Sequence, residues 1–291
     1  MQTSLKMAIA SVPSLPGDVE GNLNKIEQAA REAARVGCEF LLTPEMSASG
    51  YGSYPEVLKT AERAGDGPIY RGLSEIASAY GMAVAAGFAE PDGDRRLISH
   101  YCVFPDGRFN VTRKHRVTPA EFPLSPAVRL YYDDTEEIGH VYEGEEKFNV
   151  FTVKGIPCAI VICADWGIKN LLDKLQRLGV RLVMLVTGAG GTKDDRYSLE
   201  ALRDPKNTVL REKYLKEMGH CAPDGMLFEC MDRNMAFACC NLIGDDGKKY
   251  CHGGSGKIVN CDGELLYTMP GIPVIEKMRT TCGFAELKFK L

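Results

Sequence analysis

Apolar runs alternate with amphipathic segments along the first half of the chain. In residues 17–37 the apolar side chains recur at helical spacing and share one face. Residues 97–104 and 108–113 flank Asp106-Gly107, which favours a hairpin turn. The pattern predicts helices at 17–37 and 68–80, and strands at 5–12, 39–43, 83–90, 97–104 and 108–113.

The second half repeats this alternation. The run at 156–163 is continuously apolar, as expected of a strand that is buried on both faces. Strands that alternate with helices indicate an α/β protein. No linker interrupts the pattern, so we expect one domain over residues 1–291. Further strands are predicted at 181–187, at 236–242 and on both sides of Asp262-Gly263, and further helices at 167–178 and 225–235.

Composition and charge indicate which partners and environments we do not expect for this chain. Hydrophobic residues make up 45% of the 291 positions and charged residues 25%, as in ordinary folded domains. The net charge of −4 has both signs interspersed, which argues against nucleic-acid binding. No apolar run reaches the roughly 20 residues of a membrane span. The N-terminal apolar stretch is too short for a signal peptide, so we expect a cytoplasmic protein.

Three side chains with chemical potential stand at the ends of apolar, strand-like runs, where a rigid strand can aim them into a crevice. Cys163 closes the buried run just before a predicted helix, whose positive end would favour a thiolate and supply backbone donors to an oxyanion. Glu45 follows a short strand and a proline, and could act as a general base. Lys114 closes the run at 108–113.

Each of these residues, taken alone, also has a purely structural explanation. Most of the eleven cysteines are expected to be small buried hydrophobes, and Cys163 could be one of them. Glu45 could be a solvated loop acid. Lys114 stands among other basic residues in Arg113-Lys114-His115-Arg116, which is typical of a solvated charge run.

Together, the segments around these residues resemble the nitrilase superfamily, the carbon-nitrogen hydrolases with a Glu-Lys-Cys triad. The resemblance covers most of the chain and rests on five motifs in the right order. Those motifs are GDVEGNLNKIEQAAREAARVGCEFLLTPEMSASGY (17–51), FPDGRFNVTRKHRVTPAEF (104–122), IPCAIVICAD (156–165), MDRNMAFACCNLIG (231–244) and GGSGKIVNCDGELL (253–266).

The resemblance implies an α-β-β-α sandwich that pairs with a second subunit across a helical face, giving a homodimer or higher homo-oligomer. It implies that Cys163 is the nucleophile, Glu45 the general base and Lys114 the triad lysine. Glu121 stands where many members carry a second glutamate, although an exposed loop acid explains it equally well. The N–H of Ala164 is a plausible second oxyanion donor. The chemistry requires no metal or organic cofactor.

The segments after the nucleophile depart from the family pattern. Asp165 is followed by Trp166-Gly167, without the arginine and the aromatic-Pro-Glu that many members carry. The strand at 181–187 leads into small residues at 187–191, which suggests an altered pocket floor. The stretch at 192–222 is longer than expected, and we predict that it borders the pocket or a subunit interface.

Cys163-Ala164-Asp165 favours an amidase or carbamoylase, because true nitrilases usually continue with Trp-Glu. We therefore predict a cysteine hydrolase that cleaves a non-peptide C–N bond of a small linear amide or N-carbamoyl amine through a thioester. Two alternatives stay open: a nitrilase, and a member of the fold that binds a ligand without hydrolysing it. The complete set of Glu45, Lys114 and Cys163 argues against the second, because a binding protein does not need all three.

Overall fold

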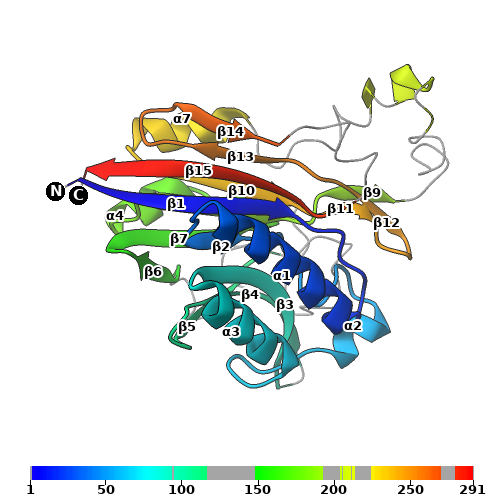
Figure 1. Cartoon of the computed structure of the whole chain (residues 1–291). Helices are drawn as coiled ribbons and strands as arrows, with labels where there is room; N and C mark the ends of the chain where they lie inside the picture. Colours follow the sequence, from blue (N-terminus) through cyan, green and yellow to red (C-terminus); the bar gives the residue numbers. More distant parts are fainter. Residues whose placement is uncertain are drawn as a thin grey trace.

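Two facing β-sheets form the centre of the molecule (Figure 1). The computed structural model describes residues 2–93, 95–116, 148–192, 204, 206–210, 212–213, 224–269 and 279–290. Within these ranges the strands make two six-stranded sheets and one three-stranded sheet.

The first sheet has the order β15-β1-β2-β3-β4-β5. Its centre is parallel, because β1 pairs with β2 and β2 with β3 in the same direction, and its other pairs are antiparallel. Its strands are β1 (Gln2–Ser11), β2 (Phe40–Leu42), β3 (Ala83–Asp92), β4 (Arg95–Val103), β5 (Phe109–Arg113) and β15 (Thr281–Lys290).

The second sheet has the order β14-β13-β10-β8-β7-β6, with a parallel centre formed by β10, β8 and β7. The small third sheet has the order β11-β12-β9. The strands of these two sheets are β6 (Val150–Val153), β7 (Ile156–Ile162), β8 (Leu182–Thr187), β9 (Gly190–Thr192), β10 (Ala236–Asn241), β11 (Ile243–Asp245), β12 (Tyr250–Gly253), β13 (Gly256–Val259) and β14 (Leu265–Thr268).

Helices cover the outer face of each large sheet (Figure 1). Apolar side chains of α1 and α3 share one buried cluster with the first sheet, and those of α4 and α7 share another with the second. The helices are α1 (Val19–Arg35), α2 (Pro55–Lys59), α3 (Pro68–Tyr80), α4 (Leu171–Arg177) and α7 (Asp224–Asp232).

The alternation of side chains along each strand produces these layers. On β8, Leu182, Met184 and Val186 lie in the cluster between the two sheets, whereas Val183 and Leu185 face the cluster with the helices. β1 behaves in the same way on the first sheet, because its alternate apolar residues divide between the inner and outer clusters. The predicted α-β-β-α sandwich is therefore confirmed.

One predicted helix is wrong at its start. The chain predicts a helix from residue 167, but a 3₁₀ turn spans Cys163–Gly167 and α4 begins only at Leu171. Asn170 separates the two, because it adopts a left-handed φ of 56°, which a continuous right-handed helix excludes. Cys163 therefore stands at the start of a short 3₁₀ turn rather than at the N-terminus of an α-helix.

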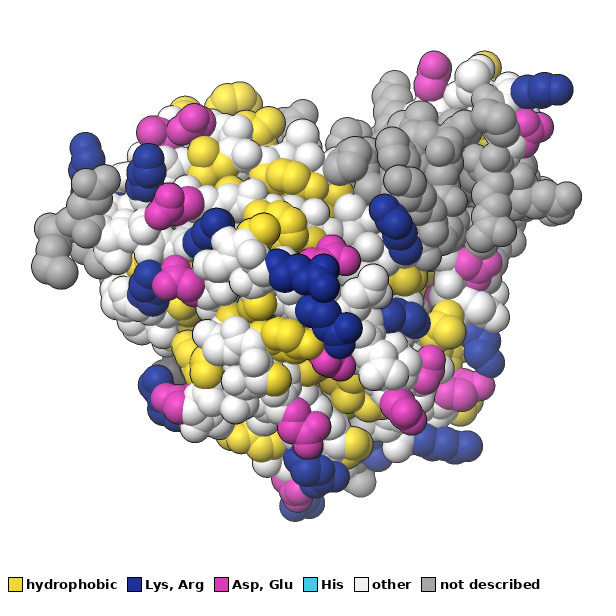
Figure 2. All heavy atoms as spheres, in the orientation of Figure 1, with side chains coloured by type: hydrophobic (Ala, Val, Ile, Leu, Met, Phe, Trp, Pro, Cys, Tyr) yellow, Lys and Arg dark blue, Asp and Glu magenta, His cyan; other side chains and the backbone are white. Residues whose placement is uncertain are grey.

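The surface seen in Figure 2 mixes acidic, basic and apolar side chains without a large region of one sign. This agrees with the interspersed charges of the sequence. Among the helices of the described residues, none has the length and apolar character that crossing a membrane requires.

Candidate active site

The loop that follows β2 carries Glu45 and is buried throughout. Every residue at 41–50 is buried. Thr43 Oγ1 donates a hydrogen bond to the Ala85 carbonyl at 2.8 Å, and His100 Nε2 lies 3.0 Å from the Thr43 carbonyl. These contacts anchor the loop two residues before Glu45, so they limit where its carboxylate can lie.

A close approach between this loop and β3 fixes the turn after Glu45. A Cβ on Gly87 would lie 2.1 Å from Met46 N, so only glycine fits on the strand at that point. The Ala48 N–H donates to the Gly87 carbonyl at 2.9 Å. Met46 itself has a φ of 52°, in the left-handed region that side chains disfavour. Strained backbone of this kind is typical of functional sites.

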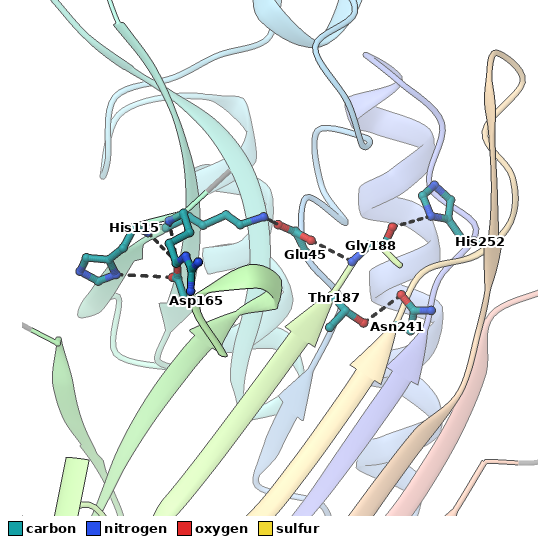
Figure 3. A network of polar contacts seen from close by, with 9 residues as sticks. Glu45, His115, Asp165, Thr187, Gly188, Asn241 and His252 are labelled. Atoms are coloured by element: carbon teal, nitrogen blue, oxygen red, sulfur yellow. Dashed lines mark hydrogen bonds and ion pairs between the residues drawn. The ribbon is translucent and has the colours of Figure 1, made fainter. Parts of the chain in front are cut away.

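Both carboxylate oxygens of Glu45 accept a hydrogen bond (Figure 3). Lys114 Nζ donates to Oε1 at 2.7 Å, and the Gly188 N–H donates to Oε2 at 2.8 Å. The Glu45 and Lys114 side chains are both 0% exposed. Two donors to a water-excluded carboxylate favour its ionised form, which is the form a general base needs.

Lys114 stands one residue beyond β5 and comes from the first sheet. Its backbone N–H donates to the Ile98 carbonyl at 2.8 Å, which extends the pairing of β5 with β4 to this residue. The side chain then crosses to Glu45 in the interior. The solvated charge run that the basic sequence also allowed is therefore wrong for this residue.

Cys163 immediately follows β7, on the second sheet. Ile162 pairs with Val186 of β8, so Cys163 lies one residue beyond that pair, level with Thr187 at the end of β8. Gly188 is the next residue of that chain segment. Its φ of 46° is left-handed, which is rare for a residue with a side chain. Its side chain is partly exposed. A strained, accessible thiol at a strand end has the geometry expected of a nucleophile.

Several other cysteines have thiols that burial makes unreactive. Desolvation raises the pKa of Cys158 to about 12 and that of Cys230 to about 12, and it raises the pKa of Cys102 and Cys240 well above the ordinary value. These four thiols are buried in the apolar clusters, as the sequence predicts for most of its cysteines. They would remain protonated at neutral pH and are poor nucleophiles.

Asp165 ties the turn of Cys163 to the loop of Lys114 (Figure 3). Its Oδ1 accepts from the backbone N–H groups of His115 and Arg116, at 2.9 and 2.7 Å. The side chain is 3% exposed, so these hydrogen bonds are shielded from water. Asp165 thereby couples the positions of the candidate nucleophile and the candidate lysine.

The residues after β8 are held from several sides. Thr187 Oγ1 donates to Asn241 Oδ1 at 2.9 Å, and Asn241 Nδ2 donates to the Ala189 carbonyl at 3.0 Å. His252 Nδ1 lies 2.9 Å from the Gly188 carbonyl. A Cβ on Gly188 would lie 2.5 Å from the Tyr51 ring, so glycine is required there.

The sequence-predicted residues converge at one end of the two sheets. Glu45 and Lys114 touch, while Cys163 and Ala164 occupy the turn that Asp165 links to them. Their catalytic roles stay predictions. Glu121 and most of the stretch at 192–222 lie outside the described residues.

The sequence analysis includes Gly188 only among the small residues at 187–191, and it missed Asn241 and His252. Gly188 follows a buried strand, as Glu45 and Cys163 do, and that common position was the available signal. His252 gave no such signal, because it lies on a strand of four residues that carries little pattern.

Two surface hollows lie elsewhere. One, of about 700 Å³, adjoins the hairpin at 104–110, and the other, of about 780 Å³, lies between α1, α2 and α3. Neither is lined by Glu45, Lys114 or Cys163, so we assign neither to the candidate reaction. Within the described ranges, no three His, Cys, Asp or Glu side chains gather as metal ligands would.

Known proteins resemble this chain in sequence. The family model of the carbon-nitrogen hydrolases matches residues 6–200. The hydrolase in the pqqF 5′ region of Pseudomonas protegens is 26% identical over 184 residues, which are 63% of this chain and 59% of that protein. A nitrilase of Pyrococcus abyssi is 28% identical over 147 residues, half of each chain. The chain thus spans about 50–59% of the length of these two relatives.

A solved structure resembles it in fold. A mutant of the amidase from Nesterenkonia sp. AN1, in complex with butyramide, has a TM-score of 0.66 at 18% identity, covering 97% of this chain and 90% of that one. At this identity the likeness concerns the arrangement of strands and helices.

Proposed function

Since the chain belongs to the carbon-nitrogen hydrolase family, we propose that it hydrolyses the C–N bond of a small linear amide or N-carbamoyl amine through a thioester on Cys163. The observation that carries the proposal is the buried contact of Glu45 with Lys114 and the Gly188 N–H, beside the strand end that bears Cys163. A carboxylate and an ammonium buried against each other, beside an accessible thiol, are the kinds of group that amide cleavage needs.

In the acylation half, Glu45 takes the thiol proton as Sγ attacks the amide carbonyl carbon. Lys114 Nζ and the Ala164 N–H stabilise the oxyanion that forms. As the tetrahedral intermediate collapses, the C–N bond breaks and the nitrogen takes the proton from Glu45. Ammonia or an amine leaves, and the acyl group remains on Cys163 as a thioester.

In the deacylation half, the Glu45 carboxylate takes a proton from water, and the resulting hydroxide attacks the thioester carbonyl. The C–S bond breaks, Cys163 recovers its proton from Glu45, and the carboxylic acid leaves. One amide and one water thus give one acid and one amine. Lys114 keeps Glu45 ionised between the two halves, because an adjacent ammonium favours the carboxylate.

Two observations support an amide over a nitrile. The Cys163-Ala164-Asp165 sequence lacks the Trp-Glu that usually follows the nucleophile of true nitrilases. The fold is shared with an amidase whose structure holds butyramide, a small linear amide. Because the chain is also similar to a nitrilase of Pyrococcus abyssi, nitriles are the alternative substrate class.

Ammonia release tests the proposal. The purified chain is incubated with a panel of linear aliphatic amides, N-carbamoyl amines and the matching nitriles, with Cys163→Ala as the control. We expect ammonia from at least one amide or carbamoyl compound and none from the control. Release from nitriles alone would favour the nitrilase, and a panel without any release would favour a ligand-binding protein.

A further inference from the structure

His252 lies beside the candidate site but takes no part in the mechanism above. It stands on β12 and is 2% exposed. Its Nδ1 lies 2.9 Å from the Gly188 carbonyl, and a carbonyl can only accept, so Nδ1 carries the proton. Burial lowers the pKa of His252 to about 4, outweighing the opposing charge of Asp246, so the ring is neutral at neutral pH.

Gly188 is therefore held on both of its backbone polar groups. Its N–H donates to Glu45 Oε2 at 2.8 Å, and its carbonyl accepts from His252 (Figure 3). We propose that His252 is a positioning residue: by fixing the Gly188 carbonyl it keeps the Gly188 N–H directed at Glu45. The inference rests on the proposed role of Glu45 as general base.

The local backbone explains why such an anchor is needed. Gly188 has no side chain and can adopt the widest range of backbone angles of any residue. Asn241 holds the residues on either side, through hydrogen bonds with Thr187 Oγ1 and the Ala189 carbonyl, and neither of these bonds is made to Gly188 itself. His252 supplies the hydrogen bond to the carbonyl of Gly188, so its loss would allow the N–H to turn away from Glu45.

The surroundings of the ring favour a fixed orientation. The Tyr51 ring meets it edge to face at 5.1 Å between centroids, and His252 Nδ1 would lie 3.0 Å from a Cβ on Gly190. Nε2 has no hydrogen-bond partner among the described residues. The contact that the proposal needs is therefore made by Nδ1, and the two ring nitrogens can be tested separately.

Three variants distinguish the contribution of Nδ1 from that of Nε2. His252→Asn places an amide nitrogen where Nδ1 stands, His252→Gln places one where Nε2 stands, and His252→Leu removes both. We expect kcat to fall about tenfold or more in the Gln and Leu variants, with KM within about threefold, as one weakened donor to a catalytic carboxylate implies. The Asn variant should stay within about threefold of the parent kcat.

The pH dependence provides a readout that a merely structural role would not move. Without the Gly188 donor, the Glu45 carboxylate loses a contact that favours its ionised form. The acid limb of kcat/KM should therefore shift to higher pH in the Gln and Leu variants and stay in place in the Asn variant. Urea midpoints for all three variants identify any that fails to fold. If the Leu variant fails to fold, the comparison of the Asn and Gln variants tests the proposal.

Alkylation of Cys163 by iodoacetamide across pH supplies a measurement that requires no substrate, with Glu45→Gln as the reference for a lost base. The same shift of the acid limb is expected in the alkylation rate. A Leu variant with parental rates, or a folded Asn variant as impaired as Leu, would overturn the positioning role. If the parent chain hydrolyses no amide, the proposed function fails, whereas the alkylation profile still decides whether His252 acts on Glu45.

Discussion

Glu45 and Lys114 form a charge pair that is fully enclosed, with 2.7 Å between Nζ and Oε1. Removing one partner leaves the other charge buried and uncompensated, which costs roughly 3–5 kcal/mol of stability, whereas removing both is far less damaging. Each residue is also predicted to act directly in catalysis. Stability and activity should therefore respond differently to single and double substitution.

We predict that Glu45→Gln and Lys114→Met each lower turnover at least about a hundredfold. Each should also lower the free energy of unfolding by several kcal/mol. The double variant should recover a substantial part of the lost stability and none of the activity. Urea unfolding and ammonia release measure the two quantities on the same samples. A single variant that loses less than about tenfold in turnover would remove that residue from the triad.

The strained backbone at Cys163 allows stability to be tested apart from activity, because two inactive variants of this residue should differ in stability. Its φ of 46° suits glycine and penalises any residue with a Cβ by roughly 1–2 kcal/mol. We predict that Cys163→Gly has a higher melting temperature than Cys163→Ala, although both are inactive. Calorimetry of the two variants measures the difference. Equal melting temperatures, or a more stable alanine variant, would contradict the strain.

At the scale of elements, the strand-end residues could be predicted because buried strands have an unmistakable pattern. Residues 156–162 and 182–186 are apolar without interruption, since both strands are buried on two faces. Cys163 closes such a run, whereas the strand before Lys114 is only partly buried. The strand ends alone left a structural explanation open for Glu45, Lys114 and Cys163, and it was the resemblance to the nitrilase superfamily that joined the three into one predicted site.

Other elements carried weaker patterns. β15 alternates between buried residues such as Leu287 and exposed charges such as Lys288, and it pairs with β1 from the opposite end of the chain. Such a partner is decided by tertiary packing rather than by local sequence. The same holds for His252, because its hydrogen bond to the Gly188 carbonyl joins residues 64 positions apart in the sequence. Contacts between short loops of distant segments leave no periodic signal.

At the scale of the whole molecule, the candidate site draws on both sheets. Glu45 and Lys114 come from the first, and Cys163 and Gly188 from the second. The site therefore exists only while the two sheets face each other across their shared apolar cluster. Conditions that loosen the sandwich should abolish activity together with the fold.

Buried histidines make that sandwich sensitive to acid. Burial lowers the pKa of His252 and of His100 from 6.5 to about 4. Between these values the unfolded chain binds more protons than the folded one, so stability falls as pH drops below about 6.5 and the loss is complete below about 4. Each ring accounts for about 3 kcal/mol.

We therefore predict that the free energy of unfolding declines steadily from pH 6.5 to 4.5. His252→Asn should decline less over this range, because asparagine does not titrate. Urea unfolding at several pH values measures both slopes. Parallel slopes for the parent and the variant would show that His252 does not titrate as its burial requires.

The thioester is the central claim, and rapid-quench mass spectrometry tests it most directly. The parent chain is mixed with the amide that releases most ammonia, quenched in acid during turnover and digested. We predict an acyl group of the substrate's mass on the peptide that contains Cys163, and no acylated peptide from Cys163→Ala. Turnover without an adduct on that peptide, or with an adduct on another cysteine, would contradict the account.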